Sequence, residues 1–197
     1  MSLLNKKKYE GACALFYDYE IKNQEGKLIK KQKLIESKSF VKAFIQALAE
    51  AFGNMSVSII DTSNTVCTVS PSSGFVWNAS SAAGTIVNGL VVGTGTNAVT
   101  IDDYKLQTLI AHGSTTGKLQ YGASTVSLPS FTTTVGSIIL TRVFSNNSSG
   151  SITINEIGIY NIMGNNYYFC IARDIPTPII LAIGEQLTLN YTIGVAI

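Results

Sequence analysis

Apolar and polar side chains alternate along much of this chain, a pattern typical of β-strands that bury one face. Turn-forming Gly, Asn, Ser and Pro residues interrupt the alternation about every ten residues. Strands at this spacing predict a mainly β fold, an antiparallel β-sandwich of the jelly-roll kind. The predicted strands lie at residues 11–22, 27–36, 57–60, 65–69, 75–77, 89–92, 119–121, 125–128, 131–145 (one strand, or two around Gly136), 151–160 (with a bulge near Gly158), 167–173, 179–183 and 186–197.

Residues 37–53 break this alternation and repeat apolar side chains every three or four positions, which predicts one amphipathic helix. Ser37 or Ser39 is expected to cap its N-terminus through a side-chain oxygen, and Gly53 to adopt the left-handed conformation at its C-terminus. The apolar stripe is wide enough to pack on the chain's own sheet, which we favour, or on a neighbouring subunit. It consists of Phe40, Val41, Phe44, Ile45, Leu48, Ala51 and Phe52.

Residues 88–122 form a continuous block in which a short apolar strand leads into a Gly/Thr turn, two acids and a second apolar segment. The glycines of the turn at residues 93–96 are expected where φ is positive. Asp102 and Asp103 begin a segment, 104–111, whose apolar spacing fits a short helical turn. We interpret the block as the joint between an N-terminal docking segment and the sandwich, close to a subunit contact.

Length and charge divide the chain into two parts. Its 197 residues fit one domain with a small appendage. We predict a basic N-terminal arm and β-hairpin over residues 1–36, and a helix plus β-sandwich domain over residues 37–197. Residues 1–42 hold ten lysines and five acidic residues, whereas residues 43–197 hold four basic and seven acidic residues.

This charge asymmetry has two interpretations of similar weight. A basic segment on a slightly acidic body suits contacts between neighbouring subunits. Alternatively, the lysines keep an exposed edge strand from aggregating. The lysines alternate along the predicted hairpin, and residues 1–42 contain no arginine, which argues against nucleic-acid binding.

Charged residues make up 13% of the chain, about half of the roughly 25% that is usual in soluble domains. Ser, Thr, Asn and Gly supply polarity instead. Such a surface favours a homo-oligomer over a free monomer, although a β-protein with threonine-rich outer faces is the alternative. No apolar run reaches the roughly 18 residues that span a bilayer, and the N-terminal apolar run is too short for a signal peptide, so no membrane association is expected.

Side chains capable of nucleophilic chemistry are few and scattered. Cys13, Cys67 and Cys170 form no C-x-x-C pair, so neither a zinc site nor a redox pair is indicated, and we expect small buried apolar side chains. His112 is the single histidine and would have to serve any Cys–His pair, but a hydrogen bond to a backbone carbonyl near a turn is the favoured role. We predict no catalytic, cofactor-binding or metal-binding residues.

Several charged residues admit both a chemical and a structural interpretation. Asp102 and Asp103 could hold Ca²⁺ through oxygen ligands, but no D-x-D-x-D-G pattern is present, and capping of the following segment is favoured. The sequence G-T-G-T lacks the lysine of a P-loop and the third glycine of a dinucleotide fingerprint. Glu156 is expected to form a partly buried ion pair with Arg142 or Arg173, which would specify strand register.

Aromatic residues offer the main alternative to a purely structural role. Stacked on one face, they could bind a sugar, although tyrosine on β-faces commonly serves packing alone. The candidates are Tyr9, Phe16, Tyr17, Tyr19, Trp77, Tyr167 and Tyr168.

Three segments carry a resemblance to a known family: GLVVGTGTNAVTIDDYKLQTLIAHGSTTGKLQYG, INEIGIY and ARDIPTPIILAIGEQLTLNYTI. Their order resembles that in virion structural proteins of tailed bacteriophages, related viruses and prophages. In that family a VGTG turn, a D-x-x-L segment, an E-[VI]-G-[LI]-[YF] strand and a closing L-T-V-x-Y-x-I strand follow one another. The sequence SFVKAFIQALAEAFG resembles the helix that often precedes them, so the similarity covers residues 37–197.

The resemblance implies a β-sandwich, a place on the virus particle and self-association, and it carries no catalytic residues. We therefore expect a non-enzymatic structural protein of the virion, a capsid-associated, decoration or tail component. It would act as a homo-oligomer that docks on other virion proteins. The alternative hypothesis is a glycan-binding jelly-roll module for host attachment.

Overall fold

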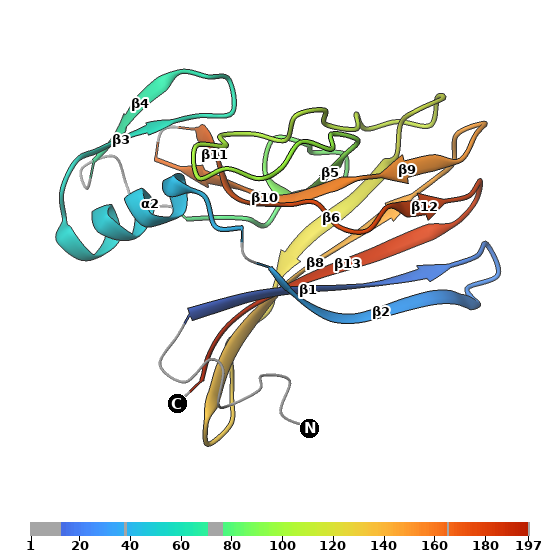
Figure 1. Cartoon of the computed structure of the whole chain (residues 1–197), viewed down its shortest axis with the longest axis horizontal. Coiled ribbons are helices and arrows are strands. Elements are labelled where there is room, and N and C mark those ends of the chain that lie inside the picture. Colours follow the sequence, from blue (N-terminus) through green and yellow to red (C-terminus); the bar gives the residue numbers. More distant parts are fainter. Residues whose placement is uncertain (1–12, 38, 71–76, 165, 197) are drawn as a thin grey trace.

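The computed structural model describes residues 13–37, 39–70, 77–164 and 166–196, which form a mainly β molecule with antiparallel sheets. Figure 1 shows two sheets packed face to face, which confirms the predicted antiparallel β-sandwich. The large sheet has the order β2 (Leu28–Ser37), β1 (Cys13–Lys22), β13 (Gln186–Ala196), β8 (Val135–Ser145) and β6 (Gln120–Val126), with β7 (Ser130–Phe131) also paired to β8. The second sheet has the order β11 (Tyr167–Asp174), β10 (Glu156–Met163) and β5 (Gly89–Gly93).

Two small strand pairs and one helix complete the described fold. The strand pairs are β12 (Ile179–Leu181) with β9 (Ile152–Ile154), and β3 (Val57–Ile60) with β4 (Val66–Val69). The helix is α2 (Lys42–Gly53), which lies beside the β3–β4 pair at one end of the molecule (Figure 1). No helix in the described part of the chain is long and apolar enough to cross a membrane.

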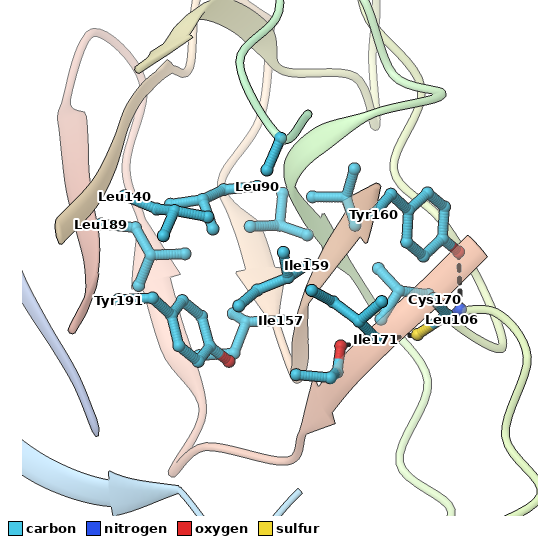
Figure 2. Packing of buried hydrophobic residues seen from close by; sticks show 14 of the residues in the cluster. Leu90, Leu106, Leu140, Ile157, Ile159, Tyr160, Cys170, Ile171, Leu189 and Tyr191 are labelled. Atoms are coloured by element: carbon cyan, nitrogen blue, oxygen red, sulfur yellow. Dashed lines mark hydrogen bonds between the residues drawn. The ribbon is translucent and has the colours of Figure 1, made fainter. Parts of the chain in front are cut away.

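The main core lies between the two sheets, because alternation along the strands points one apolar face of the large sheet at the second sheet. In Figure 2, Leu140, Leu189 and Tyr191 of the large sheet lie across from Ile157 and Ile159 of β10. Each of these five residues is at most 3% exposed. Their removal from water is the main contribution that this interface makes to stability.

The second sheet is covered on both faces. Residues 94–110 form a loop that brings Leu106 to the side of β10 away from the large sheet, where the Leu106 N–H donates to the Tyr160 hydroxyl at 2.7 Å (Figure 2). A Cβ on Gly158 would lie 3.1 Å from Leu106 Cδ2, so the glycine permits this close packing. The bulge predicted near Gly158 lies between Ile159 and Tyr160.

The predicted helical turn at residues 104–111 is wrong. The Thr94 N–H donates to the Thr108 carbonyl at 2.9 Å, and the Ile110 N–H donates to the Val92 carbonyl at 3.0 Å. The segment therefore runs along the edge of β5, which satisfies backbone groups that a helix would satisfy internally. This pairing, rather than the apolar spacing, determines the conformation.

Both predicted helix caps are also wrong. Neither serine caps α2, which begins only at Lys42. Ser37 ends β2, and the Ser39 carbonyl accepts the N–H of Arg173 in β11 at 3.1 Å. Because this segment pairs along the edge of β11, the helix can begin only after it. At the other end the left-handed residue is Asn54 (φ 48°), one position beyond the predicted glycine.

The helix packs on its own chain, as favoured above. Phe44 is buried and stacks on Phe40, with ring centroids 3.8 Å apart. The opposite side of the predicted stripe faces solvent, since Ile45 is 60% and Phe52 87% exposed. The stripe is thus narrower than the sequence spacing indicates.

Strand boundaries differ from the prediction in a few places. Residues 119–128, predicted as two strands, contain the single strand β6, whose bulge absorbs the interruption. Residues 131–145 include the end of β7 and all of β8, so two strands are present, but the break lies at residues 132–134 rather than at Gly136, which is inside β8. Residues 151–160 are divided between β9 and β10. The predicted strand at 75–77 lies, except for its last residue, outside the described residues.

The predicted N-terminal hairpin is present as β1 and β2. It belongs to the large sheet, because β1 pairs with β13 along its whole length from Cys13 to Lys22. Lys31 of β2 forms an ion pair with Glu20 of β1. The division of the chain at residue 36 stays a prediction.

Candidate functional site

Glu156 opens β10 and is completely buried, although it carries a carboxylate. Its Oε1 accepts the backbone N–H groups of Gly95 at 2.9 Å and Thr108 at 2.7 Å, and its Oε2 accepts the N–H of Gln107 at 3.0 Å. These donors compensate for the lost hydration of the carboxylate. Two separate parts of the loop at residues 94–110 are thereby fastened to one side chain.

Arg173 of β11 supplies the opposite charge and is also completely buried. Its Nε donates to Glu156 Oε2 at 3.0 Å, its Nη1 to Asp103 Oδ2 at 2.8 Å, and its Nη2 to the Asn97 carbonyl at 3.1 Å. Burial opposes the charged form, but the hydrogen bonds to Asp103 and Glu156 outweigh it and raise the pKa of Arg173. The predicted ion pair with Glu156 is confirmed for Arg173. We call Glu156, Arg173 and Asp103 the Glu156 cluster.

The two glycines of the G-T-G-T turn serve a purpose other than the predicted one. Neither Gly93 nor Gly95 has a positive φ. A Cβ would lie 2.5 Å from Glu156 Oε1 at Gly93 and 2.6 Å from the same atom at Gly95. The backbone must come this close for the Gly95 N–H to reach the carboxylate, so a side chain there would displace Glu156.

The adjacent acids are not helix caps, because no helix follows them. Asp103 accepts the backbone N–H of Thr100 at 3.0 Å and binds Arg173, whereas Asp102 pairs with Lys42 of α2 at 2.6 Å. Both carboxylates therefore serve to hold the loop to neighbouring elements. Among the described residues, His, Cys, Asp and Glu do not gather in groups of three or more that could hold a metal ion.

Arg142 of β8, the other predicted partner of Glu156, is buried in a different way. Within the described residues it forms no ion pair, and its guanidinium lies over the Tyr121 ring, 4.8 Å from the centroid. Burial lowers the pKa of Arg142 to about 10, so the group remains protonated at neutral pH. Its donors all point at backbone carbonyls: Nε at Gly122 (2.8 Å), Nη1 at Leu90 (2.8 Å) and Asn88 (3.4 Å), and Nη2 at Thr85 (2.6 Å).

The nucleophile candidates lie in settings that do not activate them. Cys67 and Cys170 are buried as predicted, and burial raises the pKa of both thiols, which disfavours the reactive thiolate. Cys13 is exposed, contrary to the prediction, because it begins β1 at an end of the large sheet that the described residues leave uncovered. His112 Nδ1 accepts the backbone N–H of Tyr121 at 3.1 Å, so its partner is an amide rather than the predicted carbonyl.

Asp174 is a further buried charged residue, which sequence reasoning missed. Asp174, at the end of β11, is 8% exposed, and its Oδ2 accepts hydrogen bonds from the Ser37 and Tyr191 hydroxyls, each at 2.7 Å. Burial raises the pKa of Asp174, although these hydrogen bonds partly oppose the change. The available signal was an acid that follows Arg173 at the end of a strongly apolar strand segment.

The described members of the aromatic set proposed for sugar stacking are not assembled on the surface. Among the described residues, the exposed aromatics of the Phe, Tyr and Trp types are Phe52 on α2 and Phe131 on β7. The described residues therefore form no stacking surface from the predicted set. Of that set, Phe16, Tyr17 and Tyr19 are buried, Trp77, Tyr167 and Tyr168 are half-buried, and Tyr9 lies outside the described residues.

The arrangement around Glu156 is suited to a structural role, namely to hold the loop at residues 94–110 against the second sheet. Its charged groups face each other or backbone N–H and carbonyl groups, whereas catalysis needs an acid, base or nucleophile within reach of a substrate. A neighbouring open hollow of about 240 Å³, which Leu106, Gln107 and Tyr160 help to line, has Lys105 as its one charged side chain. Comparisons with protein-family models, curated proteins and solved structures found no match for this chain.

Proposed function

We propose that this protein is a non-enzymatic structural component of a virus particle, related to those of tailed bacteriophages. It acts by associating with copies of itself and by docking on other virion proteins. Its localisation is the virion, as a capsid-associated, decoration or tail component.

The observation that carries this proposal is where the family-like motifs lie. The glycines of VGTG and the glutamate of EIGIY contact each other, since the Gly95 N–H donates to Glu156. Arg173 of the ARD sequence completes the cluster through both Glu156 and Asp103. The polar groups of these motifs are therefore engaged in holding a loop to a sheet. This role suits a protein that presents a stable surface to its partners.

The surface supports the same proposal. Charged residues are scarce, at 13% of the chain, and large apolar side chains such as Leu128, Phe52 and Phe131 are more than three-quarters exposed. Surfaces of this composition are typical of proteins that bury them against partners. The glycan-binding alternative has no comparable support, because the described residues form no aromatic stacking surface.

Sedimentation velocity of the purified full chain over a wide concentration range tests the proposal. We expect association that increases with concentration. In a second experiment, a specific antibody against the protein is expected to label intact virus particles in electron microscopy. A chain that stays strictly monomeric at high concentration and binds no particle component would overturn the proposal. A monomer that gives specific hits on a glycan array would replace it with the attachment hypothesis.

A further inference from the structure

The core-facing side of the large sheet continues beyond the second sheet. Its residues form successive cross-strand pairs between β8 and β13, and the pair Leu140–Tyr191 is buried inside the sandwich. In the next pair on the same face, Ile138–Ile193, both side chains are half-buried. Figure 1 shows the ends of β8 and β13 projecting past the second sheet. The described residues therefore leave the apolar face of the core uncovered at this end.

The hairpin between β7 and β8 extends this apolar face. Phe131 pairs with Gly136, which in turn pairs with Val195. A Cβ on Gly136 would lie 3.1 Å from Phe131 Cδ1 and 3.7 Å from Val195 Cγ2, so the phenylalanine ring lies across the glycine beside the valine. Phe131 is nevertheless 78% and Val195 49% exposed. These side chains, together with Ile138 and Ile193, line an open groove of about 200 Å³.

We call this surface the apolar tip, comprising Pro129, Phe131, Gly136, Ile138, Ile193 and Val195. It is built from segments without a charged side chain, since residues 119–141 and 186–197 contain no Asp, Glu, Lys, Arg or His. In contrast, the edge strand β2 of the same sheet carries Lys30, Lys31 and Lys33. Charge thus protects this edge strand from association and is missing from the tip.

We infer that the apolar tip is the surface through which two copies of this chain pack face to face. In a two-fold symmetric contact the same patch meets itself, so a patch of one net charge would repel its copy. An uncharged apolar patch has no such repulsion and gains from the removal of Phe131 and Val195 from water. A strongly basic or acidic partner would find no complementary charge on the tip. The inference rests on the self-association in the proposed function and assigns it a surface.

The test compares two exposed phenylalanines of the same chain. Phe131→Glu puts a charge on the tip, and Phe52→Glu puts the same charge on α2, where the side chain is 87% exposed. In sedimentation velocity of the full chain, Phe131→Glu is expected to raise the dimer dissociation constant at least tenfold, whereas Phe52→Glu leaves it unchanged. Circular dichroism melting of both variants verifies that they fold.

Charge reversal tests whether the tip meets itself. An equal mixture of Phe131→Glu and Phe131→Lys chains is expected to associate when neither variant does so alone, because the two tips then carry opposite charges. Wild-type chain that associates while the mixture stays monomeric would overturn the face-to-face contact but leave the proposed function intact. The same holds if Phe131→Glu associates as wild type does. Wild type that is monomeric throughout would overturn both.

Removal of residues 1–12 distinguishes two possible occupants of the apolar tip: a second copy of the chain, and the N-terminal segment of the same chain. Residues 1–12 precede Cys13 in the sequence, and Cys13 pairs with Val195 of the tip. Phe131→Glu is expected to weaken association equally with and without these residues. If the substitution acts only while residues 1–12 are present, those residues are the occupant of the tip, and the face-to-face contact is overturned.

Discussion

Arg142 and Arg173 are both completely buried, but the protein compensates their charges in different ways. Arg173 lies between the carboxylates of Glu156 and Asp103. Arg142 has only backbone carbonyls and aromatic rings around it within the described residues. One arginine is therefore half of a charge network, and the other is a lone cation held by neutral acceptors.

The two arginines nevertheless do the same kind of work. Arg173 holds the loop at residues 94–110 to the second sheet, and Arg142 holds the chain at residues 85–90 to the large sheet. Irregular backbone cannot satisfy its carbonyls through a regular ladder, and a guanidinium offers five donors in a fixed geometry. Buried arginines in this protein therefore hold irregular segments to regular strands, whether or not a counter-ion is present.

The largest effect is expected when Arg173 loses its buried counter-ion. Glu156→Leu leaves the guanidinium without its fully buried partner and three backbone N–H groups without an acceptor. Breaking a buried pair in this way typically costs about 3–5 kcal/mol. Urea unfolding followed by circular dichroism should show a loss of this size. A variant that unfolds at the wild-type midpoint would contradict the role assigned to the cluster.

Glu156→Gln is the matched control for this change. It preserves shape and one acceptor oxygen while it removes the charge, so its loss should be clearly smaller than that of Glu156→Leu. Equal losses in the two variants would show that the charge, rather than the hydrogen bonds to the loop, carries the stability.

A smaller loss is expected at Arg142. Arg142→Met keeps the apolar length of the side chain but leaves its carbonyl acceptors without these donors. Unpaired neutral acceptors cost less than an unpaired charge, so we expect a loss of about 2 kcal/mol in the free energy of unfolding. Urea unfolding measures it, with Arg142→Lys as a control that retains the charge but not the fork of donors. A loss of stability as large as that of Glu156→Leu would contradict the conclusion that the neutral acceptors of Arg142 contribute less than the charge network of Arg173.

Sequence patterns predicted the parts of this fold that depend on local alternation. Most strands lie where alternation placed them, and a Glu156–Arg173 pair was one of two alternatives because isolated charges inside apolar strands require partners. The sequence could not decide between Arg142 and Arg173, since that choice depends on which strands become neighbours. The order β11-β10-β5 places Arg173 beside Glu156.

The failures share one physical cause. Residues 104–111 have the apolar spacing of a helix, and Ser37 and Ser39 the chemistry of caps, but both segments pair with sheet edges formed by residues distant in sequence. Gly95 was explained by local conformation, whereas its reason is the approach of Glu156. Local propensity is a weak guide where a long-range hydrogen bond is available to the same backbone.

Asp174 extends the comparison to a buried negative charge for which the described residues provide no cation. Its carboxylate is held by the Ser37 and Tyr191 hydroxyls, and burial raises its pKa in the folded state. A raised pKa means that the folded protein binds this proton more tightly than the unfolded chain. The resulting stability is fully present below the pKa of the unfolded carboxyl, about 3.9, and is lost as pH rises through the folded pKa.

Asp174→Asn should therefore stabilise the protein at neutral pH, the smallest expected effect and the one of opposite sign. The amide keeps an acceptor oxygen for the two hydroxyls and removes a charge that has lost its hydration, so we expect a gain of less than about 1 kcal/mol. Urea midpoints measured from neutral pH down to about pH 4 should show the gain shrinking as wild-type Asp174 takes up its proton. Asp18→Asn, on the outer face of β1, is the control. A destabilised Asp174→Asn at neutral pH would show that the ionised carboxylate is well compensated, which would place Asp174 with Arg173 rather than with Arg142.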